Sequence, residues 1–120
     1  IRSVPKGDSV GYGRTFTAQK DSRIAIIPIG YADGIPRNLS CGNGRIRIRQ
    51  YIVPIIGRIC MDQLAVDITE AEDIVVGDVA TFIEAKAESE LAAPVVADQT
   101  GSISNELLCR IGARLPVIEK

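Results

Sequence analysis

The sequence predicts one mainly β domain, similar to a β-barrel, with one or two short helices near its C-terminal end. A chain of 120 residues has the size of one domain, and a hydrophobic content of 46% is enough for a single core. Apolar and polar residues alternate over several short segments, as in half-buried strands. Gly, Asp and Asn separate these segments at short intervals, which favours a closed or nearly closed barrel.

The first predicted strands differ in how deeply they are expected to be buried. Residues 24–29 form a nearly continuous aliphatic run that ends at Gly30, so a buried strand is expected there. Residues 45–49 alternate strictly between Arg and Ile, which predicts a strand with one solvent-exposed and one buried face. Residues 51–59 form the next strand, in which Pro54 requires a bulge or an edge position.

Two further strands complete the middle of the chain. Leu64, Val66 and Ile68 fall on one face of the first, because side chains alternate along a strand. Residues 78–84 form the second, after turn residues at 76–78.

The last third changes from strand to helix. Ser104 stands where an N-cap is expected, Leu107, Leu108 and Ile111 share one helical face, and Gly112 ends the helix.

A final strand is predicted over residues 114–119. Residues 85–98 stay ambiguous, because their first half favours helix whereas Pro94 would break one.

Charge and composition exclude several classes of partner. Fourteen basic and fifteen acidic residues leave a net charge of −1, which does not favour nucleic acid or an anionic membrane. Arg45, Arg47 and Arg49 alternate without an aromatic stacking platform, so a solvated strand face or a subunit contact is the better interpretation.

Cysteine usage favours a reducing, cytosolic setting. Cys41, Cys60 and Cys109 form no CxxC pair, and no histidine is present to complete a zinc site. No apolar run approaches the ~18 residues that cross a bilayer. Because the sequence opens at Ile1 without Met, we expect a domain excised from a longer protein.

Four segments hold more glycine and polar residues than a barrel requires: residues 10–16, 29–37, 57–63 and 101–116. In the first, Tyr12 lies between two glycines, either as a phenol presented at a cleft or as a turn residue whose ring only packs. In the second, Tyr31 follows a strand, where site residues and ordinary rim packing are both common.

The third segment holds a strand-end triplet with several possible roles. Asp62 can hydrogen-bond a tyrosine or cap local amides, and Met61 can be a core residue. Cys60 is a poor candidate for a nucleophile, since the chain has no histidine to act as its base.

Taken together and in this order, the four segments resemble the C-terminal domain of alanine racemases. They read GYGRTF at 11–16, PIGYADGIPR at 28–37, GRICMDQ at 57–63 and GSISNELLCRIGARLP at 101–116. Each alone is a weak signal, but four in sequence are specific. The resemblance runs over essentially the whole chain.

The resemblance implies one half of a racemase that uses pyridoxal 5'-phosphate (PLP) on alanine or serine. In that family an N-terminal α/β barrel carries PLP on a lysine, and this β-domain follows it. The enzymes are head-to-tail homodimers, in which each site combines one barrel with the partner's β-domain. This chain alone is therefore expected to be inactive and not to bind PLP covalently.

The resemblance also assigns roles to individual residues. Tyr12 matches the acid/base tyrosine that works opposite the lysine, and its phenol, with an ordinary pKa of about 10, needs a basic helper from the barrel. Met61 matches the residue whose backbone N–H binds the substrate carboxylate. Tyr31 and Ile103 match positions of the substrate entryway, and Asp62 belongs to its inner polar layer.

One departure from the family pattern concerns substrate choice. Asn105 stands where most alanine racemases have a tyrosine that reaches the cofactor phosphate and crowds the substrate side chain. Asparagine is smaller and offers an amide donor and acceptor, which suits a substrate hydroxyl. We therefore expect a tilt toward serine, as in the serine racemases of vancomycin-resistant bacteria, which this chain also resembles; retained alanine preference is the alternative. Those enzymes carry a membrane domain, so we expect a cytoplasmic domain of a possible membrane-anchored parent.

Two non-enzymatic alternatives stay open. A β-barrel binding module would not need the four polar segments to converge on one opening, whereas a racemase half would. A purely structural or dimerisation domain predicts that Tyr12→Phe leaves the activity of the full protein intact.

Overall fold

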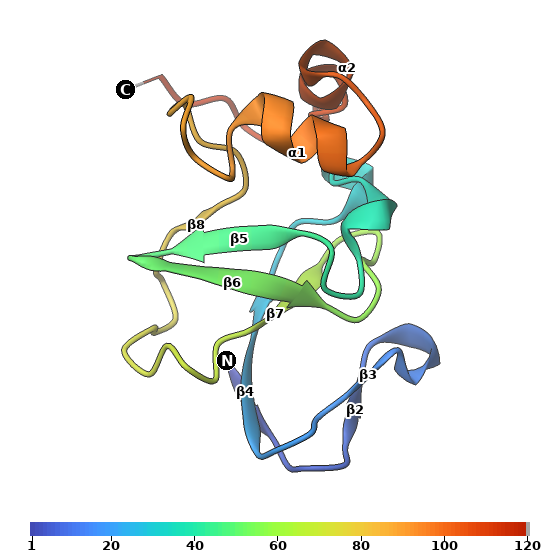
Figure 1. Ribbon diagram of the computed structural model, residues 1–120, viewed down its shortest axis with the longest axis vertical. Helices are drawn as coiled ribbons and strands as arrows, with labels where there is room; N and C mark the ends of the chain where they lie inside the picture. The colour runs from blue at the N-terminus through green and yellow to red at the C-terminus, as the bar shows by residue number, and fades with distance from the viewer. Residues whose placement is uncertain (120) are drawn as a thin grey trace.

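Short alternating segments form strands in the computed structural model, which describes residues 1–119 and, of Tyr12, the backbone alone. In chain order the strands are β1 (Arg2–Val4), β2 (Ser9–Val10), β3 (Phe16–Thr17), β4 (Ser22–Ile27), β5 (Arg45–Ile48), β6 (Tyr51–Ile56), β7 (Leu64–Asp67) and β8 (Ala80–Thr81) (Figure 1). Three 3₁₀ turns, η1 (Tyr12–Arg14), η2 (Tyr31–Asp33) and η3 (Arg37–Leu39), precede the helices α1 (Ala93–Gln99) and α2 (Ser104–Cys109). Among the described residues, no helix is long and apolar enough to cross a bilayer.

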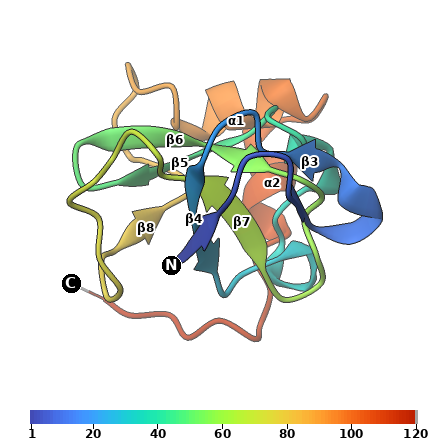
Figure 2. The same cartoon turned by 90° about the horizontal axis from the view of Figure 1, so that it is seen from below.

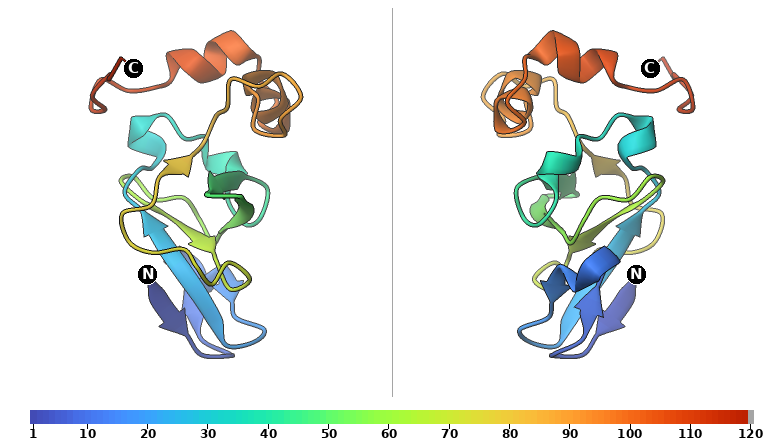
Figure 3. Two further views of the ribbon diagram at one scale, coloured as in Figure 1. Left: turned by 90° about the vertical axis from the view of Figure 1, so that its left-hand side faces the viewer. Right: turned by 90° about the vertical axis from the view of Figure 1, so that its right-hand side faces the viewer.

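Six strands form one antiparallel sheet in the order β1-β4-β7-β6-β5-β8. Its central pairing places Ile24 opposite Asp67 and Ile55 opposite Val66. The strands β2 and β3 form a separate hairpin. The helices cover the β5–β6 hairpin at one end of the molecule, and β2 and β3 lie at the other end (Figures 1 and 3).

The core lies between the sheet and the helices. Leu64, Val66 and Ile68 are at most 1% exposed, as their shared face predicts. They join Val96 of α1 and Leu107 of α2 in one buried cluster. Packing of the helices onto the sheet therefore fixes the C-terminal third against the strands.

The expected mainly β fold with two short helices near the C-terminal end is confirmed, but the sheet does not close into a barrel. In the described part of the chain, the outer strands β1 and β8 pair with β4 and β5 and with no further strand. Figure 2 shows the same sheet from below. With three and two residues, they are too short to supply a closing ladder.

Several expected strand limits are wrong. The strand expected over 51–59 ends at Ile56, because Gly57 turns the chain with a φ of +63°. The strand expected over 78–84 is reduced to β8. The strand expected over 114–119 is absent: Leu115 N–H donates to Gly112 O within a turn, and Pro116 has no N–H for a ladder.

The helix prediction is right in place and partly wrong in detail. Helix α1 tolerates Pro94 because it lies in the first turn, where its missing N–H has no partner to lose. In α2, Ser104 is the first helical residue and Ile103 the N-cap. Leu107 is buried, whereas Leu108 and Ile111 are 48% and 42% exposed and share no core face with it.

Carboxylates neutralise the alternating arginines. Arg45 lies 3.9 Å from Glu90, Arg47 pairs with Glu84, and Arg49 Nε lies 2.7 Å from Asp78. The alternating arginines therefore form an ion-paired face along β5.

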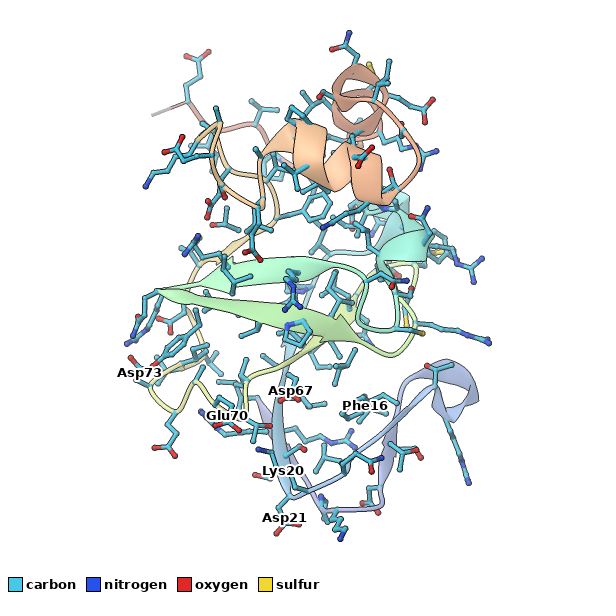
Figure 4. All side chains as sticks on the ribbon, viewed as in Figure 1. Phe16, Lys20, Asp21, Asp67, Glu70 and Asp73 are labelled. Carbon is cyan, nitrogen blue, oxygen red and sulfur yellow. The ribbon has the colours of Figure 1, made fainter. Side chains whose placement is uncertain are left out.

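The far end of the sheet carries its own ion pair. Lys20, before β4, bonds Glu70, which follows β7, near Asp21 and Asp67 (Figure 4). This pair joins the loop before β4 to the loop after β7, and its two residues are fifty positions apart in sequence.

Candidate active site

The first candidate segment forms the tight turn η1, which requires glycine on both sides of Tyr12. Gly11 and Gly13 adopt φ angles of +83° and +68°, in the region that a Cβ disfavours. A Cβ at Gly11 would lie 3.7 Å from Arg58 N and 3.8 Å from Gly57 Cα. The backbone before Tyr12 therefore packs against the residues that follow β6.

Those residues lead into a loop that forms one open groove with η1. Gly11 lines this groove together with the whole of the loop from Cys60 to Gln63. We call it the 60–63 groove. The Met61 side chain is 52% exposed there, so Met61 is not a core residue. In the described part of the chain, the Met61 N–H donates to no protein acceptor, whereas its carbonyl is bonded.

The second candidate segment is bound to the same loop through its backbone. Tyr31 N–H donates to Cys60 O and Ala32 N–H donates to Met61 O, both at 3.0 Å. Gly30 makes this approach possible, because a Cβ there would lie 2.2 Å from Cys60 O. The Tyr31 side chain is 43% exposed, with the Arg37 guanidinium 5.8 Å from its ring centre. The turn η2 thus lies directly beside the 60–63 loop.

The fourth segment reaches this region through its C-terminal end. Gly112 N–H donates to Asp33 O at 3.0 Å. The side chain of Arg114 lies between two carboxylates, with Nη2 2.6 Å from Asp62 Oδ1 and Nε 3.4 Å from Asp33 Oδ1. The hydrogen bond to Asp62, then the charges of Asp33 and Asp62, raise the pKa of Arg114 above its ordinary value. These contacts therefore favour the charged form of the guanidinium further.

The two remaining predicted residues lie apart from this centre. Ile103, the N-cap of α2, is 67% exposed, and Asn105 in the first turn is also exposed. Among the described residues, no hydrogen bond or ion pair joins the Asn105 side chain to the 60–63 groove.

The structure thus brings Tyr31, Met61 and Asp62 together in or beside the 60–63 loop, with Gly11, the residue before Tyr12, on the same groove, and leaves Asn105 on helix α2. The phenol of Tyr12 lies outside the described residues. Sequence reasoning missed Arg114, which it assigned to a final strand. A contact across 52 residues leaves no local pattern, although Arg114 falls within the last of the four quoted segments.

The whole arrangement matches a known family. Residues 1–119 match the family described as "Alanine racemase, C-terminal domain". The chain belongs to this family. Over its whole length it is 53% identical to an "Amino-acid racemase" of Enterococcus faecalis, of which it spans 17%. It is 43% identical to an "Alanine racemase" of Cutibacterium acnes, over 96% of the chain and 30% of that protein.

Solved racemase structures share the fold. The alanine racemase of Bartonella henselae "with covalently bound pyridoxal phosphate" superposes with a TM-score of 0.86 at 34% identity, over 94% of this chain and 30% of that one. This racemase domain therefore spans less than a third of the proteins that it matches.

Proposed function

We propose that this chain supplies one half of the active site of a racemase that interconverts the L and D forms of alanine or serine. The observation that carries the proposal is the convergence of the four segments. Gly11 of the segment 10–16 lines the 60–63 groove together with residues 60–63. The segment 29–37 bonds the same loop through its backbone, and the segment 101–116 contacts 29–37 and 57–63 through Arg114 and Gly112. A binding module with an unrelated ligand gives no reason for all four to meet.

Racemisation removes the α-proton from one face of an amino acid and returns a proton to the other. We assign the Tyr12 phenol to one face and a lysine of the accompanying domain to the other. With an ordinary phenol pKa of about 10, Tyr12 needs a positive neighbour to act near neutral pH. That neighbour would come from outside this chain.

Met61 suits the substrate carboxylate through its main chain. Its N–H lies in a loop that lines the 60–63 groove, without an acceptor among the described residues. Hydrogen bonds to a charged acceptor are stronger than neutral ones, so one backbone donor orients a carboxylate effectively. The apolar side chain at this position is then compatible with a polar role.

The cofactor of this reaction would be PLP, which supplies the electron sink that makes the α-proton acidic. The part of this chain that fits it is the amide of Asn105. The Asn105 side chain is exposed and has no hydrogen-bond partner in the described part of the chain, and an amide N–H is a suitable donor to a phosphate oxygen. The lysine that carries PLP would lie in an α/β barrel beyond this chain.

We further propose that the site forms between two subunits of a head-to-tail homodimer. The 60–63 groove is open to solvent on this domain, as expected if a second surface completes it.

The direct test is racemisation by the full-length protein loaded with PLP. We expect it to convert L-alanine or L-serine to the D enantiomer, whereas the 120-residue chain alone should convert neither. If the loaded full-length protein racemises neither amino acid, the proposal is wrong.

The finer proposal, a shift of substrate preference from alanine toward serine, rests on Asn105. An asparagine leaves space and a hydrogen-bonding group where a tyrosine would crowd the substrate. Asn105→Tyr in the full-length protein should raise the ratio of kcat/KM for alanine to that for serine by about tenfold, the effect of one hydrogen bond to a substrate hydroxyl. Gln99→Tyr on the neighbouring helix α1 is the control; an unchanged ratio in Asn105→Tyr would remove Asn105 from substrate selection.

A further inference from the structure

A buried carboxylate lies behind the turn that carries Tyr31. The side chain of Asp33 is 3% exposed, and its Oδ2 accepts a hydrogen bond from Gly30 N–H at 3.0 Å. Burial of a charge is costly unless a cation or several donors compensate it. The cation that faces this carboxylate is Arg114, with Nε 3.4 Å from Oδ1.

The same guanidinium holds the loop on the other side. Arg114 Nη2 donates to Asp62 Oδ1 at 2.6 Å, and Asp62 follows Met61 directly. The fork of a guanidinium can bond two carboxylates at fixed relative positions, which an ammonium cannot do equally well. Arg114 therefore ties η2 to the 60–63 loop, in parallel with the backbone bonds from Tyr31 and Ala32.

We propose that Arg114 is a positioning residue of the racemase site, acting through Asp33 and Asp62. It fixes the Met61 N–H relative to Tyr31, so that the substrate carboxylate is held where the acid/base groups can reach the α-carbon. This inference rests on the proposed function. Arg114 itself needs no contact with substrate or cofactor.

The chain contains a matched control for this cluster. Arg49 also bridges two aspartates, with Nε 2.7 Å from Asp78 and Nη1 3.4 Å from Asp73. Its side chain is 39% exposed, against 53% for Arg114, and it lies at the end of β5 among residues that do not line the groove. Arg49→Gln thus removes a comparable ion pair without touching the candidate site.

The first measurement is steady-state racemisation of both alanine enantiomers by the PLP-loaded full-length protein. A misplacement of about 1 Å costs on the order of 100-fold, so Arg114→Gln should lower kcat/KM by about 10- to 100-fold, mainly through KM. Arg114→Lys should recover part of this loss, and Arg49→Gln should stay within about twofold, as distant surface changes do.

A double-mutant cycle separates positioning from general destabilisation. If Arg114 acts through Asp62, Arg114→Gln combined with Asp62→Asn should lose little more kcat/KM than Arg114→Gln alone. Fully additive losses, or an Arg114→Gln variant within about twofold of the parent, would overturn the proposal.

A second measurement does not depend on activity. Hydrogen exchange of the full-length protein should show the amides of Tyr31 and Ala32, which bond the 60–63 loop, exchanging at least about tenfold faster in Arg114→Gln. Their exchange should be unchanged in Arg49→Gln. If the parent racemises nothing, the proposed function fails, and this exchange still decides whether Arg114 holds the loop; unchanged exchange in Arg114→Gln would show that it does not.

Discussion

Met61 is an apolar residue whose available hydrogen-bonding group is its backbone N–H. Its side chain lies half exposed in the 60–63 groove, its carbonyl is bonded to Ala32 N–H, and its own N–H has no protein acceptor among the described residues. The chemistry available at this position therefore belongs to the backbone. Substitutions of Met61 that keep or remove the N–H therefore separate the role of the backbone from that of the side chain.

Met61→Leu and Met61→Pro should differ sharply in the full-length protein. Leucine keeps the N–H and nearly the same volume, so kcat/KM should stay within about threefold of the parent. Proline removes the donor, and a lost hydrogen bond to a charged group corresponds to about 10- to 150-fold in kcat/KM. Steady-state kinetics with alanine measure both; equal losses in the two variants would show that the side chain matters instead.

The approach of η2 to the 60–63 loop depends on Gly30. A methyl group there would meet Cys60 O at 2.2 Å and Met61 O at 2.5 Å, and backbone atoms cannot move aside as flexible side chains can. A side chain at position 30 would therefore force η2 away from the 60–63 loop.

Gly30→Ala should therefore impair both stability and activity. We expect a loss of about 1–3 kcal/mol in the free energy of unfolding, as for other overpacked sites. We also expect kcat/KM to fall at least about tenfold, because the Met61 loop moves. Gly7→Ala is the control: with a φ of +91° and no atom within 4 Å, it strains the backbone without a clash and should leave kcat/KM unchanged. Parent-like kinetics in Gly30→Ala would contradict this contact.

The β5–β6 hairpin has a pH dependence of its own. The hydrogen bond from Arg49, followed by the Val75 N–H, lowers the pKa of Asp78 in the folded protein. A carboxyl with a lowered folded pKa stabilises the fold above its unfolded pKa of about 3.9 and loses that contribution as the pH falls through the folded value.

Asp78→Asn should therefore have a lower midpoint of thermal unfolding than the parent at pH 6. The difference should shrink as the pH falls below about 4. Unfolding of the full-length protein followed by circular dichroism at several pH values measures it. A difference that stays constant from pH 6 to pH 2 would contradict the ion pair as its source.

The local sequence pattern predicted most of the elements but not their ends. Strict alternation located β5, and the shared face of Leu64, Val66 and Ile68 located β7, because both patterns report burial directly. The expected strand over 114–119 failed because alternation says nothing about whether a partner strand is available. The expected closure of the barrel failed for a related reason: alternation does not show that the outer strands β1 and β8 are only three and two residues long.

The candidate site was predictable only where glycine and polar residues cluster in sequence. Tyr31, Met61 and Asp62 stood out in such clusters, and the structure places them side by side. Arg114 and the buried Asp33 did not stand out, because their importance comes from a contact between distant segments.

The domain spans 17% and 30% of two of the racemases that it matches. Over the described residues its sheet is open, its groove is open to solvent, and its candidate groups are backbone donors and exposed side chains. These features suit a domain whose site is completed by another surface.

The most direct test of this account is the exchange of the α-proton of alanine with solvent deuterium in the full-length protein carrying Tyr12→Phe. Loss of one of two opposed acid/base groups should abolish exchange from one enantiomer and reduce exchange from the other far less, with folding preserved. Equal losses from L- and D-alanine, or parent-like exchange from both, would contradict the assignment of Tyr12 to one face of the substrate.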